Sequence, residues 1–387
     1  MNWRTAAARL APGFLVLLAA GGMLVGAQAA PPARVPLGLP GLPASARTSP
    51  ALADLGRKLF FDRRLSFNGT MSCAMCHVPE EGFTSNGSRT AVGMEGKSLR
   101  RNAPALYNVV WQRSLFHDGR EDALANQVWL PLLHADEMAN PSVGLVLARI
   151  RGLRDYHSAF EKVFSGRGPS MDRVGAAIAA FEATLVSGNS RFDRYRYGGE
   201  ASALSVRERS GFDLFRGKAG CVACHTVGER HALFSDGRFH VTGAGFVAEG
   251  ERFTVPLAPG VSTELSDAEL TSFAGHDEPD LGRFEITKRP EDRYAFKTPS
   301  LRNVSRSAPY MHDGTMATLE EVIEFYSRGG GTVVGRSPLL KSLALSPEDK
   351  RALVAFLKSL DGDNLDALAK AARRNLPVEL GGNAPGY

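Results

Sequence analysis

Residues 73–77 read Cys-Ala-Met-Cys-His, and residues 221–225 repeat this pattern as Cys-Val-Ala-Cys-His. Two cysteines that are separated by two residues and followed at once by a histidine are typical of covalent c-type haem attachment. The thiols would bond to the vinyl groups of one haem, and the adjacent imidazole would bind its iron. The sequence therefore predicts two haem c groups. Their predicted attachment and iron-binding residues are Cys73, Cys76 and His77, and Cys221, Cys224 and His225.

Other chemistries also use a Cys-x-x-Cys pair, namely a redox-active dithiol or half of a zinc site. Neither explains why a histidine follows the second cysteine in both places. The chain contains 4 cysteines, and the two motifs use all of them. No cysteine is left for a disulfide bond or for a thiolate nucleophile.

The composition predicts an ordinary globular protein. A length of 387 residues suggests two or three domains. With 43% hydrophobic and 22% charged residues, the chain can form a packed core, and bulk disorder is not indicated. The formal net charge of +5 is modest and scattered, so it does not favour a nucleic-acid partner.

The N-terminus has the pattern of an export signal. Arg4 and Arg9 precede an apolar stretch from about Leu10 to Val25, and Ala27-Gln28-Ala29 is a typical cleavage site. Cleavage would place the protein in the periplasm, where bacteria attach c-type haem. An uncleaved membrane anchor is the alternative, although proline and glycine interrupt the short apolar run. No other segment approaches transmembrane length.

An internal repeat surrounds the two haem motifs. Residues 104–109 read Pro-Ala-Leu-Tyr-Asn-Val, and residues 299–304 read Pro-Ser-Leu-Arg-Asn-Val. The tripeptide His-Asp-Gly follows each at the same distance, at 117–119 and at 312–314. The order of helix, haem motif and these two motifs is the same in both halves, which indicates duplication of a haem domain.

The spacing of apolar residues predicts a mainly α protein with few short strands. We therefore expect two cytochrome-c-like haem domains related by duplication, joined near Gly198-Gly199. The predicted order along the chain is a signal peptide at 1–29, an exposed Pro- and Ala-rich leader at 30–49, an N-terminal haem domain at 50–190 and a C-terminal haem domain at 200–372. A Gly-rich and charged insertion at about 228–296 lies within the second domain.

From about Leu55 to Leu360, the chain resembles the bacterial di-haem cytochrome c peroxidase / MauG family. The residues that carry the resemblance are the two haem motifs, Arg101-Asn102-Ala103-Pro104, Phe116-His117-Asp118-Gly119-Arg120, Gln127 with Glu137, and Ala308-Pro309-Tyr310-Met311-His312-Asp313-Gly314 with Leu319-Glu320-Glu321. In that family the N-terminal haem reacts with peroxide, and the C-terminal haem passes electrons or stores an oxidising equivalent.

The resemblance implies roles for two further groups of residues. Gln127 and Glu137 occupy the positions of the family's distal glutamine and acid–base glutamate. A partly desolvated carboxyl can move the proton that cleavage of the O–O bond requires, whereas without the resemblance Glu137 reads as a loop acid. The family also places calcium between its domains, at positions that correspond to Asn102, Ser307 and Pro309. Oxygen ligands suit this ion, but by itself Asn102 reads as a turn residue.

Two departures from the family pattern concern the iron ligands. Met94 stands where the peroxidases have a second histidine, so the N-terminal haem is predicted to be open or weakly capped. Whether Met94 binds that iron is open. Tyr326 stands where the peroxidases have a methionine ligand to the C-terminal haem, and MauG-type members use tyrosine there. The alternatives to Tyr326 are Met311, Met316, a water ligand or a vacant site.

The third departure is His117, which replaces a tryptophan that lies between the haems in the family. Imidazole is harder to oxidise than indole, so His117 either bridges the haems by hydrogen bonds or is structural. The remaining histidines show no ligand spacing and are expected to be surface or hydrogen-bonded residues. They are His134, His157, His231, His240 and His276.

Three functions remain for comparison with the structure. The first is a periplasmic peroxidase that reduces hydrogen peroxide with electrons from a small c-type cytochrome or blue-copper protein. The second is a MauG-like oxidase that uses peroxide to oxidise a residue of a partner protein. The third is a di-haem electron carrier without turnover, which Gln127 and Glu137 argue against. No stable membrane span is expected after signal cleavage.

Overall fold

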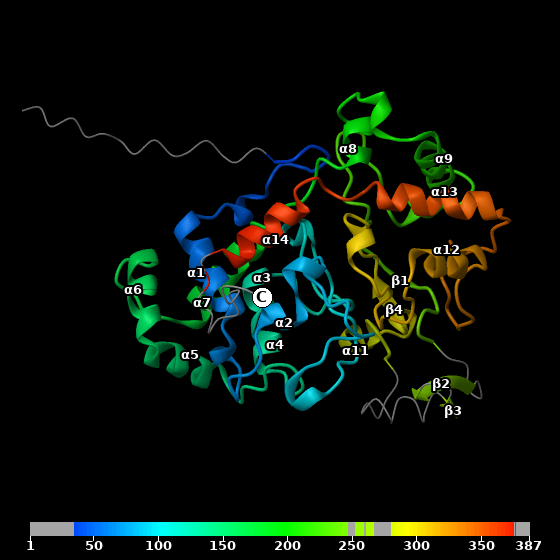
Figure 1. The fold of residues 1–387 in the computed structure, drawn as a ribbon. Coiled ribbons are helices and arrows are strands. Elements are labelled where there is room, and N and C mark those ends of the chain that lie inside the picture. The colour runs from blue at the N-terminus through cyan, green and yellow to red at the C-terminus, as the bar shows by residue number, and fades with distance from the viewer. Residues whose placement is uncertain (1–34, 247–251, 259–260, 267–279, 375, 377–387) are drawn as a thin grey trace, which may run out of the picture. The chain divides into compact units, whose positions relative to one another are not determined.

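The computed structural model describes residues 35–246, 252–258, 261–266, 280–374 and 376 (Figure 1). The predicted signal peptide at 1–29 and His276 lie outside these residues. Among the described residues, no helix has the length and apolar character that a bilayer crossing requires.

The predicted fold class is confirmed, because helices dominate the described residues. The N-terminal half contains α1 (Pro50–Phe61), α2 (Cys73–Cys76), α3 (Leu124–Gln127), α4 (Trp129–Leu133), α5 (Val143–Gly152), α6 (Arg154–Val163) and α7 (Met171–Glu182). The later helices are α8 (Arg191–Arg196), α9 (Val206–Arg216), α11 (Phe284–Thr287), α12 (Leu319–Ser327), α13 (Pro347–Lys358) and α14 (Leu365–Arg373).

Local sequence sets where these helices begin. Ser205 caps α9, and its side chain and that of Glu208 form the reciprocal hydrogen bonds of a capping box. Ser346 and Asp349 do the same for α13, which has Pro347 at its first position. Both starting points therefore follow from residues within one helical turn.

Two helix pairs show the duplication in three dimensions. α1 packs against α7, and α9 packs against α13. In the first pair, a Cβ on Gly56 would lie 1.7 Å from the carbonyl oxygen of Ala177. In the second pair, a Cβ on Gly211 would lie 2.0 Å from the carbonyl oxygen of Ala352. Glycine is required at both crossings because the helices approach too closely for a side chain.

The repeated Pro-x-Leu-x-Asn-Val motif has the same structure in both halves. Asn108 and Asn303 are left-handed, with φ of 62° and 60°. The Oδ1 atom of Asn108 accepts a hydrogen bond from the Ser187 N–H at 2.9 Å, and that of Asn303 accepts one from the Gly362 N–H at 2.8 Å. Ser187 Oγ also donates to Asn303 Oδ1 at 3.1 Å, so Ser187 links the two copies of the motif.

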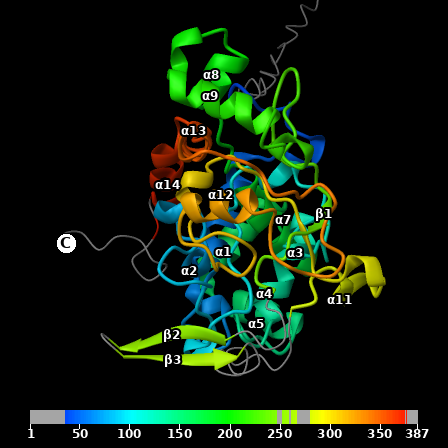
Figure 2. The same cartoon turned by 90° about the vertical axis from the view of Figure 1, so that its right-hand side faces the viewer.

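The few strands form two small antiparallel sheets within the predicted insertion and its end. β1 (Phe239–Val241) pairs with β4 (Ala295–Lys297), with His240 opposite Phe296. β2 (Arg252–Ala258) pairs with β3 (Val261–Ser266), and Figure 2 shows these two strands side by side. The insertion therefore contains regular structure that its Gly-rich sequence did not predict.

The prediction of an exposed leader is wrong for part of residues 35–49. Leu39 is only 9% exposed, and Gly38 is also buried. The Gly38 carbonyl accepts hydrogen bonds from the Ala232 N–H at 3.1 Å and from Arg302 Nη2 at 2.5 Å. The apolar side chain and these backbone bonds hold the leader against the folded chain.

The C-terminal helix α14 packs on the first half of the chain. The predicted second domain extends to residue 372, but Leu365 and Ala372 of α14 belong to the core of the first half. Arg57 of α1 donates to the carbonyl oxygen of Arg374 at 2.5 Å, and α14 lies beside α1 in Figure 1. The second core lies between α8, α9 and α13 and includes Phe192, Phe215 and Phe356.

Candidate haem sites

The first motif forms the short helix α2, and His77 follows it directly. The His77 N–H donates to the carbonyl oxygen of Cys73 at 2.9 Å, which closes the turn. The ring atom Nδ1 donates to the carbonyl oxygen of Phe83 at 3.0 Å. Burial lowers the pKa of His77, so its ring is neutral. With Nδ1 engaged, Nε2 is the nitrogen left for a metal, which is the usual arrangement of an iron-binding imidazole.

The second motif has the same arrangement around His225. The His225 N–H donates to the carbonyl oxygen of Cys221 at 2.9 Å, and Nδ1 donates to that of Phe234 at 2.9 Å. Phe83 and Phe234 are both fully buried and left-handed, with φ of 55° and 53°. The unusual backbone turns each carbonyl toward its histidine, so both halves fit a covalently attached haem.

Side chains of the repeated motif hold the second carbonyl in place. Ser300 Oγ donates to the carbonyl oxygen of Leu233 at 2.7 Å, and Arg302 Nε donates to that of Ala232 at 2.6 Å. These bonds fix the two residues that precede Phe234. The orientation of His225 therefore depends on Arg302 through this segment.

Glu137 lies beside the first haem motif. It follows α4 in a turn in which its N–H donates to the His134 carbonyl oxygen at 3.1 Å. Ionised Glu137 raises the pKa of both Cys73 and Cys76, which places the carboxyl near the attachment residues. Burial raises the pKa of Glu137 itself, while the nearby His134 and Arg120 lower it. Its side chain is 25% exposed, so it remains within reach of water.

Gln127 is the last residue of α3 and is half-buried. A Cβ on Gly175 of α7 would lie 2.2 Å from the carbonyl oxygen of Ala125, so α3 lies directly on α7. Trp129, 3% exposed, then anchors the start of α4 in the first core. Gln127 and Glu137 are thus the ends of one short α3–α4 segment that is held against the core.

Tyr326 of α12 lies near the second haem motif. Burial raises the pKa of its hydroxyl, and the thiols of Cys224 and Cys221 raise it further. The alternatives Met311 and Met316 lie in a tight turn, in which the Tyr310 N–H donates to the Met316 carbonyl oxygen at 2.6 Å. The choice between these residues as iron ligand stays a prediction.

Met94 is 6% exposed and packs in the first core. Its N–H donates to the carbonyl oxygen of Asp136 at 2.8 Å. The loop that carries Met94 is therefore tied to the residue directly before Glu137. Whether the thioether binds iron is not tested by these contacts.

His117 and His312, which are equivalent in the repeat, lie close to each other. His117 Nε2 donates to the carbonyl oxygen of Asn102 at 2.9 Å. Burial lowers the pKa of His117 to about 4, and the nearby His312 and Arg101 contribute. The His312 ring stacks on Phe296 with the centroids 3.6 Å apart and the planes at 15°. The two halves therefore meet through neutral imidazoles and an aromatic ring.

The structure brings together two of the three residues predicted to bind calcium. Asn102 Nδ2 donates to the carbonyl oxygen of Pro309 at 2.5 Å, and the Asn102 N–H donates to that of His312 at 2.7 Å. Asn102 Oδ1 is buried, and no hydrogen bond reaches it from the described residues. A buried amide oxygen without a hydrogen bond suits a hard cation. Ser307, whose Oγ donates to the Val304 carbonyl at 3.2 Å, is two residues from Pro309.

Two acids near the haem motifs, Asp236 and Glu182, were not predicted. Asp236 Oδ2 lies 2.8 Å from His240 Nε2, and both residues lie within 4.8 Å of Cys224 through their ligand atoms. His240 is thus a hydrogen-bonded residue, as expected, but it lies beside the second motif. Glu182 is buried beside Cys73. Aligning the two repeats at this position would have revealed Glu182, because the second half has leucine there.

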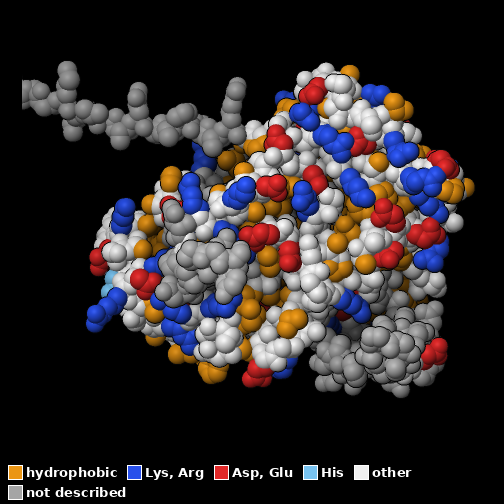
Figure 3. Space-filling view, in the orientation of Figure 1, with side chains coloured by type: hydrophobic (Ala, Val, Ile, Leu, Met, Phe, Trp, Pro, Cys, Tyr) orange, Lys and Arg blue, Asp and Glu red, His pale blue; other side chains and the backbone are white. Residues whose placement is uncertain are grey.

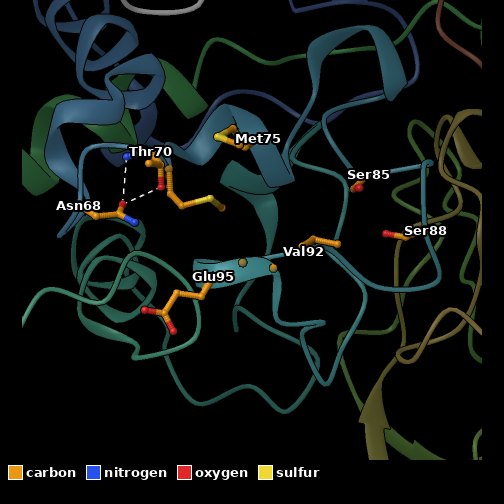
Figure 4. A pocket seen from close by; sticks show the side chains of 10 residues that line it. Asn68, Thr70, Met75, Ser85, Ser88, Val92 and Glu95 are labelled. Carbon is orange, nitrogen blue, oxygen red and sulfur yellow. Dashed lines mark hydrogen bonds between the residues drawn. The ribbon is translucent and has the colours of Figure 1, made fainter. Parts of the chain in front are cut away.

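An open pocket of about 540 Å³ adjoins the first motif (Figure 4). Met75, which stands between the two cysteines, lines it together with Met71 and Val92. The rest of the lining is polar, and Asn68 Oδ1 accepts hydrogen bonds from the N–H and Oγ1 of Thr70. On the face drawn in Figure 3, charged side chains of both signs are interspersed, and no large patch of one sign stands out.

Comparisons with known proteins agree with this arrangement. Residues 50–202 match the family model described as di-haem cytochrome c peroxidase. The chain is 38% identical over 318 residues to the methylamine utilization protein MauG of Methylorubrum extorquens. The alignment covers 81% of this chain and 79% of that relative. It is also 38% identical over 334 residues to the cytochrome-c peroxidase IdrP1 of Denitromonas iodatirespirans, covering 84% and 86%.

A solved structure has the same fold. It is described as a MauG-like protein associated with microbial copper homeostasis, and it aligns with a TM-score of 0.68 and 33% identity over 87% of this chain and 95% of its own. The chain belongs to the di-haem cytochrome c peroxidase / MauG family, as its motifs predicted. It is a peroxide-dependent oxidoreductase of that family, and family membership implies two haem c groups.

Proposed function

We propose that the protein is a periplasmic peroxidase that reduces hydrogen peroxide to water at the haem attached to Cys73 and Cys76. Electrons from a small c-type cytochrome or blue-copper protein enter through the haem attached to Cys221 and Cys224. The position of Glu137 is the observation that carries this proposal. Its carboxyl has a raised pKa, faces the first motif and remains within reach of water.

The first haem would supply the iron that binds peroxide and the electrons that reduce it. Glu137 accepts a proton from the near oxygen of peroxide and returns it to the far oxygen, which leaves as water. A carboxyl whose pKa is raised by burial can carry out both transfers near neutral pH. Gln127, at the other end of the α3–α4 segment, orients the peroxide through its side-chain amide.

The residues around the second motif support a role of its haem in electron transfer. His225 and Tyr326 are the residues that would hold the iron of this haem. A phenolate ligand favours the ferric state more than a thioether does, so this haem would supply electron transfer rather than a site for peroxide. His117, His312 and Phe296 fill the space between the halves and are the proposed path between the two haems.

We further propose a calcium ion bound by the Asn102 side chain and by the carbonyl oxygens of Ser307 and Pro309. The orphaned Oδ1 of Asn102 supports this assignment. The ion would link residues from both halves of the chain beside His312. Residues 1–29 are proposed to direct export to the periplasm before they are removed.

One observation favours a second function, a MauG-like oxidase that uses peroxide to oxidise a residue on a partner protein. Tyr326 and Met94 stand where the peroxidases of the family have a methionine and a histidine ligand. A phenolate on the second haem would stabilise oxidising equivalents. The protein would then accept them from peroxide and pass them to the partner without a small redox donor.

Steady-state reduction of peroxide by reduced cytochrome c tests the proposal. The native protein should turn over, and Glu137→Gln should slow turnover by about 10²–10⁴-fold while both haems stay attached. Asp136→Asn is the matched control, because the Asp136 carboxylate pairs with Lys97 at 3.1 Å on the surface. Turnover of Glu137→Gln at the native rate would refute the role of this residue. A long-lived oxidised spectrum without turnover would favour the MauG-like function.

A further inference from the structure

The last residue of α7 is a buried acid that the proposed peroxide chemistry does not use. Glu182 is 5% exposed, and no hydrogen bond from the described residues reaches its Oε2 atom. Burying a carboxyl without a partner is unfavourable by several kcal/mol or more when it is ionised. The presence of the Glu182 carboxyl in the core therefore has to be explained by something other than stability.

The second half of the chain shows that the fold does not need an acid at this position. Phe181 packs on Phe60 with ring centroids 5.1 Å apart, and Phe356 packs on Phe215 with centroids 5.0 Å apart. The helix crossings at Gly56 and at Gly211 have the same spacing to these phenylalanine pairs in both halves. The residue after Phe181 is Glu182, and the residue after Phe356 is the buried Leu357.

Glu182 lies beside the first attachment residue. After burial, ionised Glu182 is the strongest influence that raises the pKa of the Cys73 thiol, ahead of Cys76 and Glu137. Phe60, on which the preceding residue packs, has its ring centroid 6.5 Å from that of His77. The carboxyl is therefore next to the edge at which the first haem is bonded to the chain.

In the described helices α1 and α3, which pack on α7, no cation pairs with Glu182. α3 has no charged residue, and α7 has its other charged side chains in its first turn. On α1, Arg57 pairs with Asp54 at 3.3 Å and Lys58 pairs with Asp155 at 2.9 Å. The other acid near the same motif is Glu137. Burial raises the pKa of Glu182 to about 8.

We propose that Glu182 is a proton-exchanging residue for the first haem. It holds a proton while the haem is ferrous, and it releases that proton to solvent when the haem gives up one electron to become ferric. The reverse step takes up one electron from the redox partner and one proton from solvent. Leu357 cannot do this at the second haem. The inference rests on the proposed attachment of the first haem, and it does not require peroxide turnover.

The physical reason is charge balance in a medium of low polarity. Oxidation adds one positive charge to the haem, and a carboxylate beside it offsets that charge more strongly than it would in water. Because the carboxylate favours the ferric state, the reduction potential of the first haem falls as pH rises. One proton per electron gives a slope that approaches about 59 mV per pH unit.

Spectroelectrochemical titration of both haems over a range of pH tests this inference. In the native protein the reduction potential of the first haem should fall with rising pH near neutral pH. Glu182→Gln and Glu182→Leu should both make this potential less dependent on pH. The slope of the second haem should not change in either variant. Glu137→Gln is the matched control, because it removes the other acid near the motif and should leave a slope that depends on Glu182.

A slope for the first haem that is unchanged in Glu182→Gln overturns the inference. Should the variants fail to fold, infrared difference spectra of the native protein decide. A C=O band of a protonated carboxyl must appear on reduction, and its absence overturns the inference. Loss of peroxide turnover with an intact slope would refute the proposed function alone, whereas turnover without a slope would refute Glu182 alone.

Discussion

Replacing Arg302 by methionine should destabilise the protein far more than a surface substitution would. The Arg302 and Asp193 side chains are 2% and 0% exposed, and two N–H···O bonds of 2.9 Å join them. Arg302 also donates to the carbonyl oxygens of Gly38 and Ala232. It therefore connects the leader, α8 and the segment that orients His225.

The expected loss follows from the burial of both partners. Removing one member of a buried ion pair leaves the other charge uncompensated, which costs about 3–5 kcal/mol. Arg302→Met should lower the free energy of unfolding by this amount. Adding Asp193→Asn should recover about 2–3 kcal/mol, because asparagine carries no charge and can still accept the hydrogen bond from the Ser190 N–H.

Urea denaturation followed by circular dichroism measures these differences. Arg216→Met is the matched control, since Arg216 and its partner Asp213 are 61% and 62% exposed and such pairs contribute at most about 1 kcal/mol. Arg302→Met should also shift the spectrum of the second haem, because Ala232 lies two residues before Phe234. Equal losses in Arg302→Met and Arg216→Met, or no recovery in the double variant, would refute the reasoning.

Three other outcomes are expected at the haem sites. The carboxylate form of Glu137 accepts the proton, so the rate constant with peroxide should be highest above its pKa and fall as the pH drops through it. Since burial raises that pKa above 4.5, this decline in rate should lie above pH 4.5. In stopped-flow measurements, Glu137→Gln should show no such decline, and its rate constant should be about 10²–10⁴-fold lower. Tyr326→Phe should change the EPR signal of the low-spin ferric haem, and an unchanged signal would reject tyrosine ligation. Asn102→Ala should weaken calcium binding in calorimetric titrations, and equal affinity in the variant would exclude this residue from the site.

Short-range patterns of the sequence predicted the two haem motifs, and their recurrence predicted the repeat. Local patterns also set where helices begin. At α9 the side chain of Ser205 accepts a hydrogen bond from the Glu208 N–H and that of Glu208 accepts one from the Ser205 N–H, and both residues lie within one helical turn. The mainly α class followed from the same local spacing.

Features that depend on distant contacts were not predictable. The histidine of each motif donates to a carbonyl six residues later in one half, at Phe83, and nine residues later in the other, at Phe234. No fixed spacing marks such an acceptor, and phenylalanine is an uncommon residue with positive φ. The leader was predicted to be exposed because of its proline and alanine content, but Leu39 is buried by residues far along the chain.

The duplication separates what the fold requires from what the reaction requires. Where both halves have the same residue in the same environment, as at Gly56 and Gly211, the residue serves the packing of helices. At the position of Glu182 the environment is the same and the residue differs, since the second half has Leu357. A leucine there already satisfies the packing, so the acid of the first half is a property of its haem rather than of the fold. The same comparison assigns Arg302 to the second half alone, because its counterpart Tyr107 carries no charge that could hold the leader.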